Sequence, residues 1–162
     1  MAGLLSKLFG GNKSEKDVIK ISPLVGEINK FFNKYQSLTN DELRNKTLEF
    51  KQRIKQHLSE IDAAIDAKKE EAESLTTLDI SGRDAIYQEV DAMRKDRDQK
   101  IEEALKEILP EAFAVVKETA NRFKNNTELV SAATELDRNL SVKKSYIRIE
   151  DDKSIFKIYE KI

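Results

Sequence analysis

The sequence predicts a mainly α-helical protein: a long antiparallel helical hairpin plus shorter packed helices, with a small C-terminal β-hairpin. Three observations predict this class. Charged residues make up 36% of the 162 positions, well above the roughly 25% typical of globular domains. Only 5 glycines and 2 prolines interrupt the chain. Apolar residues also recur at steps of three and four over long stretches, which favours long solvated helices over a wide sheet.

The composition excludes several classes of protein. Lys plus Arg (29) nearly cancels Asp plus Glu (30), which removes the electrostatic basis for nucleic-acid binding, and no nucleic-acid partner is expected. The absence of cysteine excludes a disulfide framework, a thiol nucleophile and a Cys-based zinc site. No apolar run approaches the roughly 18 to 20 residues that span a bilayer, and no signal peptide is recognised. The chain is therefore expected to be made and kept in the cytosol.

Residues 1–12 are predicted to form a short amphipathic helix followed by a hinge at Gly10 and Gly11. In the functional interpretation, its apolar side chains insert into a membrane surface while lysine meets anionic headgroups. The alternative is a frayed terminus or a helix docked on its own protein. The residues expected to contact membrane are Leu4, Leu5, Lys7, Leu8 and Phe9.

Residues 13–140 are predicted to be a helical region. Ser22 and Pro23 are typical of a helix start, because proline at the first helical position loses no hydrogen bond. Pro110 is expected to end one helix and to open the next for the same reason. The expected helices cover about 23–36, 40–75, 83–108, 110–123 and 128–140.

Two of these helices should pair as an antiparallel hairpin joined by a turn at residues 76–82. Thr39 and Glu42 have the spacing of a capping box at the start of the first. The apolar stripes are interrupted at Lys68 and Arg97, whose long apolar stems can cover the seam while their charges reach water. The dense charges on the outer faces indicate solvation and pairing along each helix.

Residues 141–162 change character and are predicted to form a β-hairpin and tail. The segments 146–149 and 155–159 are rich in isoleucine and aromatic residues and flank a polar turn at 150–153, a pattern typical of paired strands. A lone hairpin is marginally stable in water, so it is expected to pack on the helices or to pair with other sequence.

No catalytic, cofactor-binding or metal-binding residue is expected in this chain. It has neither a G-x-x-x-x-G-K-[ST] phosphate loop nor a G-x-G-x-x-G turn. His57 is the only histidine and lacks the second histidine, cysteine or ordered carboxylates that a metal site or triad needs, so a structural role is predicted. Adjacent pairs such as Glu70 and Glu71 point to different parts of a helix surface.

Two segments resemble the blocks that open the SecA family, the motor ATPases of bacterial preprotein export. They are Leu-Thr-Asn-Asp-Glu-Leu-Arg-Asn-Lys-Thr-Leu-Glu-Phe at 38–50 and Leu-Pro-Glu-Ala-Phe-Ala-Val-Val-Lys-Glu at 109–118. Their order and the amphipathic start also match, so the resemblance covers about residues 1–122. Many family members have only a short link between the blocks. Residues 57–106 therefore look like a lineage-specific insertion of the kind found in SecA from Bacteroidetes, and 129–159 like a second one.

The resemblance implies an N-terminal segment of a motor that couples ATP hydrolysis to pushing preproteins through the SecYEG channel. The implied partners are the remainder of the SecA motor, SecYEG and acidic phospholipid, and the implied location is cytoplasmic, peripherally associated with the inner face of the cell membrane. ATP and Mg would bind in other parts of the family's chain, so no cofactor and no ATPase activity are expected here. The block residues are implied to be structural, packing on the motor domain: Leu43, Arg44, Lys46, Thr47, Phe50, Pro110, Glu111, Phe113 and Val116.

If the packing partner is missing, the apolar faces at Phe50, Phe113 and Phe123 are expected to be partly exposed. A free-standing helical-hairpin module for protein–protein interaction is the alternative, with a partner docking at the hairpin tip near residues 80–87. A reading frame that continues into a phosphate-binding loop would favour the SecA interpretation.

Overall fold

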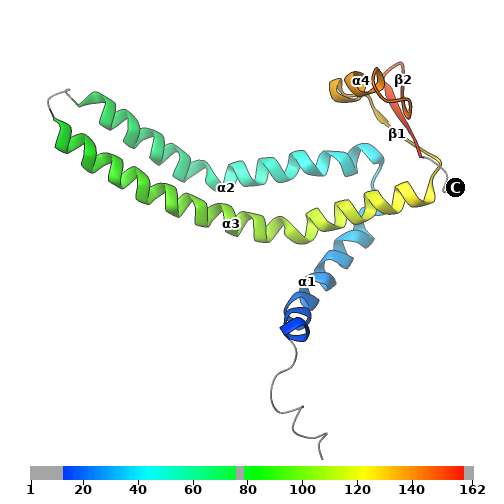
Figure 1. Ribbon diagram of the computed structural model, residues 1–162, viewed down its shortest axis with the longest axis horizontal. Helices are drawn as coiled ribbons and strands as arrows, with labels where there is room; N and C mark the ends of the chain where they lie inside the picture. The colour runs from blue at the N-terminus through cyan, green and yellow to red at the C-terminus, as the bar shows by residue number, and fades with distance from the viewer. Residues whose placement is uncertain (1–12, 76–78, 159–162) are drawn as a thin grey trace, which may run out of the picture. The chain divides into compact units, whose positions relative to one another are not determined.

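The computed structural model describes residues 13–75 and 79–158, and it confirms the mainly helical class with a C-terminal antiparallel sheet. The chain divides into two compact units. Unit 1 comprises Met1–Arg44 and Pro110–Ile162, and unit 2 comprises Asn45–Leu109. The elements in chain order are α1 (Lys13–Tyr35), α2 (Asn40–Ser74), α3 (Ile80–Asn125), β1 (Glu128–Ala132), α4 (Glu135–Ser141), β2 (Ile147–Glu150) and β3 (Lys153–Lys157) (Figure 1).

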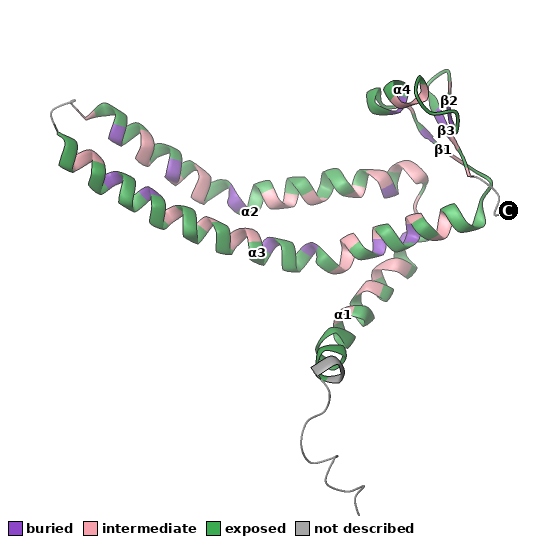
Figure 2. Cartoon of the chain, viewed as in Figure 1, coloured by how far each residue is buried: buried purple, intermediate pink, exposed green. Residues whose placement is uncertain are grey.

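Unit 2 is the antiparallel hairpin that the apolar stripes predict. Side-chain contacts fix its direction, because Asp62 on α2 meets Arg97 on α3, and Lys68 meets Glu89. The buried residues lie along the facing sides of the two helices (Figure 2). On α2 they recur every seven positions, the spacing of a coiled-coil seam. They are Leu58, Ile65 and Ala72 from α2 and Ile86, Val90, Ala104 and Ile108 from α3.

The second helix of the hairpin begins at Ile80 and not at about 83 as expected. Asp79 caps its first turn, since its side chain accepts a hydrogen bond from the Gly82 amide at 3.0 Å and its carbonyl accepts one from the Arg83 amide at 3.2 Å. A Cβ atom at position 82 would lie 2.5 Å from the Asp79 carboxylate. Glycine therefore leaves room for this cap. Residues 76–78 of the expected turn lie outside the described residues.

Pro110 does not separate two helices, so the expectation of distinct helices at 83–108 and 110–123 was wrong. Helix α3 is continuous over 46 residues with Pro110 inside it. Proline has no amide hydrogen for the Lys106 carbonyl, which interrupts the ladder by one bond. Buried Ile108 and Ala114 lie on either side of the proline, and this continued apolar packing compensates for the missing bond.

Helix α1 also starts earlier than Ser22 and Pro23 suggested. It begins at Lys13, with Pro23 in its interior. The proline leaves the Ile19 carbonyl without its helical amide partner, yet the helix continues through it. The amphipathic segment expected at residues 1–12 lies outside the described residues.

Unit 1 contains a second, smaller structure, which we call the β-lobe (residues 127–158). Its three strands are antiparallel in the order β1-β3-β2, with α4 between β1 and β2 in sequence. The predicted β-hairpin is confirmed as β2 and β3, joined at Asp151, whose φ of 53° is a turn conformation.

The helix expected at 128–140 was wrong in its first half. Residues 128–132 form β1, which pairs with β3 so that Val130 lies opposite Ile155. Helix α4 starts only at Glu135. The third strand gives the hairpin the additional pairing that a two-stranded sheet needs.

Candidate functional site at the junction of the two blocks

The two sequence blocks meet in unit 1 around a small apolar cluster. Tyr35, Leu43 and Ala114 are its buried members, at 2%, 4% and 0% exposure. The Tyr35 hydroxyl donates a hydrogen bond to the Glu111 carboxylate at 2.9 Å. Partly buried apolar residues pack around the cluster: Ile28, Phe31, Phe32, Leu38 and Val115. The cluster therefore joins the end of α1, the start of α2 and the second block on α3.

Arg122 ties the same three helices together through hydrogen bonds. Its guanidinium donates to the carbonyls of Tyr35 at 3.2 Å and Leu38 at 2.6 Å, and to the side-chain oxygen of Asn40 at 2.7 Å. Its Nε pairs with the buried Glu118 at 2.8 Å. Carbonyls at a helix end lack intrahelical partners. Arg122 donates hydrogen bonds to the carbonyls at and just after the end of α1. It also links this end to Asn40, the first residue of α2.

The β-lobe is attached to α2 by a second arginine, Arg44. Two guanidinium nitrogens donate to the two oxygens of Asp137, at 2.7 and 2.8 Å, which is the strong bidentate arrangement. The Asp137 side chain is only 2% exposed. It also accepts hydrogen bonds from the Thr134 amide and hydroxyl, at 2.9 and 2.8 Å, and from the Ser154 hydroxyl at 3.3 Å.

These contacts stabilise the charged forms of both partners. The hydrogen bond from Arg44, opposed by burial, together with the bonds from Thr134, holds the pKa of Asp137 well below its usual range. The hydrogen bond to Asp137 in turn raises the pKa of Arg44. The pair therefore stays ionised at neutral pH and acts as a fixed anchor.

The first turn of α2 also covers part of the outer edge of β1. Asn40 donates to the Val130 carbonyl at 2.8 Å, and the Ala132 amide donates to Asp41 at 2.8 Å. Arg44 reaches the Ala132 carbonyl at 3.4 Å. An uncovered edge strand is a template for pairing with another chain, so these side chains protect half of the edge.

The remaining block residues differ in exposure. In unit 1, Phe113 and Val116 are exposed, at 53% and 66%, whereas Pro110 is half-buried. In unit 2, Lys46 pairs with Glu49 at 2.5 Å, Thr47 is exposed and Phe50 is half-buried. Leu4, Leu5, Lys7, Leu8 and Phe9 lie outside the described residues. The structure thus brings Leu43 and Glu111 together at Tyr35, whereas Arg44 contacts the β-lobe.

Several residues of this junction were not identified from the sequence. Thr134 and Asp137 have capping-box spacing, and both of its hydrogen bonds form. That signal could have placed the start of α4. The contacts of Arg122 and Asn40 that join the helices carry no comparable signal, because they link residues more than 80 positions apart.

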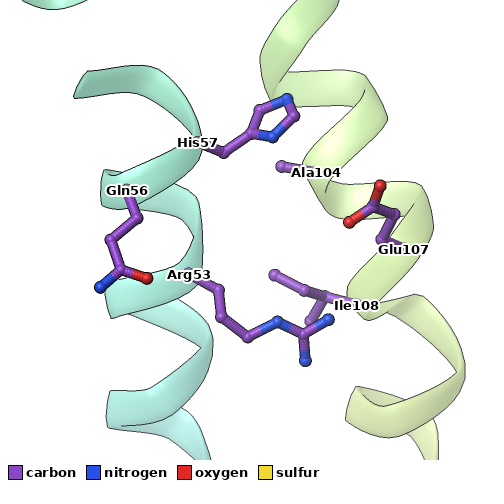
Figure 3. Close-up of a pocket in the computed structure, with 6 residues that line it drawn as sticks. All are labelled: Arg53, Gln56, His57, Ala104, Glu107 and Ile108. Carbon is purple, nitrogen blue, oxygen red and sulfur yellow. The ribbon is translucent and has the colours of Figure 1, made fainter. Parts of the chain in front are cut away.

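Unit 2 carries a shallow groove between its helices, lined by six residues (Figure 3). His57 and Arg53 reach from α2 toward α3. The His57 Nε2 atom lies 3.9 Å from the Glu103 carboxylate. Within residues 13–75 and 79–158 no group of three or more His, Asp or Glu side chains could hold a metal ion. The other lining residues are Gln56, Ala104, Glu107 and Ile108.

In the part of the chain that the structure covers, no helix is long and apolar enough to cross a bilayer.

Comparison with known proteins gives a consistent family. The model of the SecA DEAD-like domain matches residues 5–132. No solved structure matches the chain.

Relatives called protein translocase subunit SecA match most of this chain. Those of Christiangramia forsetii and Flavobacterium psychrophilum are each 44% identical over 150 residues, 93% of this chain, and that of Parabacteroides distasonis is 40% identical over 152 residues, 94% of this chain. In each case the match spans only 13% of the relative's length and lies in its N-terminal part. The chain therefore belongs to the SecA family.

Proposed function

We propose that this chain acts as the N-terminal part of a SecA motor, in which it packs on the motor domain while ATP hydrolysis drives preproteins through the SecYEG channel. Family membership supports the assignment. The observation that carries the packing role is an exposed apolar stripe on the α3 segment of unit 1.

The stripe consists of Phe113, Val116, Ala120 and Phe123, spaced by three and four residues on one face of α3. The three large side chains are 53%, 66% and 44% exposed. The opposite face, with Ala114 and Glu118, is buried within unit 1. A contiguous exposed apolar face marks a surface that another part of the protein covers. The remainder of the motor is the occupant we propose.

In this proposal the ATP and Mg sites belong to the remainder of the motor, and this chain supplies structure. Contact with acidic phospholipid is proposed for Leu4, Leu5, Lys7, Leu8 and Phe9, whose pattern is that of an interfacial helix. In this proposal the chain is located in the cytoplasm and is bound peripherally to the inner face of the cell membrane.

The packing role is tested by supplying the chain in trans. The partner is the Flavobacterium psychrophilum SecA without its matching segment, co-expressed with the intact chain or with a Phe113→Asp, Val116→Asp variant. The two aspartates should reduce co-purification by about tenfold or more, because each places a charge in an apolar interface. Leu136→Asp, a matched change of an exposed apolar residue on α4, should have no effect. Co-purification of the stripe variant at the intact level would contradict the proposal.

Membrane contact is tested by flotation with vesicles that contain anionic lipid. The intact chain should float with these vesicles and less with neutral ones, whereas a chain starting at Lys13 should remain behind. Equal flotation of both chains would contradict the lipid role and leave the packing role unaffected.

A further inference from the structure

The strand β1 has an edge that is only half covered. Its odd-numbered residues bond to β3, since the Thr127 carbonyl accepts from the Ile158 amide and the Ala133 amide donates to the Asp152 carbonyl. In an antiparallel pair, the alternate residues direct their amides and carbonyls to the opposite side. The backbone groups of Glu128, Val130 and Ala132 therefore face outward.

Three of these outward groups have no hydrogen-bond partner among the described residues. Asn40 and Arg44 of α2 donate to the carbonyls of Val130 and Ala132, and Asp41 accepts a hydrogen bond from the Ala132 amide. The amide and carbonyl of Glu128 and the amide of Val130 remain. They form a short run of two donors and one acceptor, which is the pattern that an added strand requires.

A groove of about 580 Å³ lies along this part of the strand, between the end of α3 and β1. Carboxamide side chains line it, contributed by Gln36, Asn40, Asn121, Asn125 and Asn126. The side-chain oxygens of Asn125 and Asn126 have no partner within the described part of the chain. Carboxamides both donate and accept, so they match peptide backbone groups.

The charges in the groove are already neutralised. Glu118 pairs with Arg122 at 2.8 Å, and Glu128 pairs with Arg148 at 2.8 Å. An ionic ligand therefore finds no uncompensated charge here. The apolar residues that line the groove are Leu38, Leu129 and Val130.

We propose that this groove binds an extended segment of unfolded polypeptide, which adds as a strand to the outer edge of β1. The backbone of the segment bonds to Glu128 and Val130 and is flanked by the carboxamides of Asn125 and Asn126. Recognition is then largely independent of the segment's sequence, because the contacts are to backbone groups. The groove does not involve the apolar stripe of α3, so this inference stands or falls separately from the proposed function.

The test uses the full 162-residue chain, isotopically labelled, and a capped uncharged octapeptide of alternating serine and valine. Saturating peptide should slow hydrogen exchange at the amides of Glu128 and Val130 and shift the side-chain amide signals of Asn125 and Asn126. A copy of the peptide N-methylated at every residue has the same side chains but has no amide donor on either edge. It should bind about tenfold more weakly, the factor expected for one lost hydrogen bond.

A pair of variants isolates the strand edge. Glu128→Pro removes the free amide at the first residue of an edge strand, a position where proline is tolerated. Glu128→Ala keeps that amide and removes the same carboxylate. The proline variant should bind the peptide about tenfold more weakly than the alanine variant, while the exchange rates of the β3 amides verify that the sheet is intact.

Equal affinity of the methylated peptide for the intact chain would overturn the proposal, even if Glu128→Pro fails to fold. Protection of Glu128 and Val130 that rises with protein concentration without peptide would also overturn it, since the occupant would then be a second copy of the chain.

Discussion

Two arginine–aspartate pairs of the same chemistry behave differently in the two units. In unit 1, Arg44 contacts both oxygens of Asp137, whose side chain is 2% exposed and has further hydrogen bonds from the β-lobe. In unit 2, Arg97 contacts Asp62 at 2.5 Å, but the side chains are 34% and 42% exposed. Solvent screens exposed pairs, whereas removal of one partner of a buried pair leaves an uncompensated charge. The two arginines are similarly exposed, at 36% and 34%, so burial of the aspartate is what distinguishes the two pairs.

The comparison extends to the interiors of the two regions. The hairpin seam consists of aliphatic side chains, with Val90 and Ala72 fully buried. The β-lobe buries Ile147 and Ile155, and in addition the polar residues Asp137, Ser131 and Ser154. The two serine hydroxyls also bond to each other at 2.9 Å. The hairpin is therefore stabilised by apolar burial alone, and the β-lobe by apolar burial together with a hydrogen-bonded network.

The largest effect is expected from Asp137→Ala. The change leaves Arg44 without its bidentate partner and removes acceptors for Thr134 and Ser154. The free energy of unfolding of the β-lobe should therefore fall by about 3 kcal/mol. Hydrogen exchange at the β3 amides measures this loss locally, because a chain with two units need not unfold in one step. Exchange in α2 of unit 2 should not change. Unaltered β3 exchange would show that the pair does not anchor the lobe.

The next effect is on acid stability. The pKa of Asp137 is lower in the folded protein than its ordinary value near 3.9. Its stabilisation is therefore complete above roughly pH 4 and is lost as the pH falls through the folded-state pKa. The protection factors of the β-lobe amides, which correct for the slower intrinsic exchange in acid, should therefore fall between about pH 4 and pH 2. Asp137→Asn, which cannot titrate, should already be destabilised at neutral pH and should lose less on acidification; identical pH profiles would contradict this.

Val90→Ala tests the apolar seam of the hairpin. Val90 is fully buried. Its truncation should therefore lower the free energy of unfolding of unit 2 by about 2 kcal/mol, through lost burial and a small cavity. Urea unfolding followed by helical circular dichroism, with exchange at α2 amides, measures it. Val142→Ala, at a position 86% exposed, is the matched control and should have no effect.

The smallest effect is expected from the exposed pair of the hairpin. A double-mutant cycle with Arg97→Ala and Asp62→Ala should give a coupling well below that of the Arg44–Asp137 pair, and salt should reduce it further. A coupling energy as large as that of the Arg44–Asp137 pair would contradict the conclusion that burial distinguishes the two pairs.

The sequence predicted the elements whose signals are local. The apolar stripes on α2 and α3 repeat within a few residues, and the β-prone residues of β2 and β3 flank a polar turn. It did not predict β1, because its pairing of Val130 with Ile155 joins residues distant along the chain. The Arg44–Asp137 pair joins residues 93 positions apart, and such a contact leaves no local pattern.

The two prolines misled the prediction in the same way. Pro23 and Pro110 each have the local sequence signal of a helix start, yet both lie inside continuous helices. A proline removes one hydrogen bond, but the tertiary packing of its neighbours decides whether the helix ends. That packing is not visible in the local sequence.

The contacts that cover the outer edge of β1 have a consequence for the aggregation of the protein on warming. Asn40 and Asp41 belong to the first turn of α2, and helix ends open locally long before a domain unfolds. Each fraying event removes their bonds to the Val130 carbonyl and the Ala132 amide, and so lengthens the available strand edge. Aggregation on warming should therefore begin at the temperature where this turn frays, below the melting of the sheet itself.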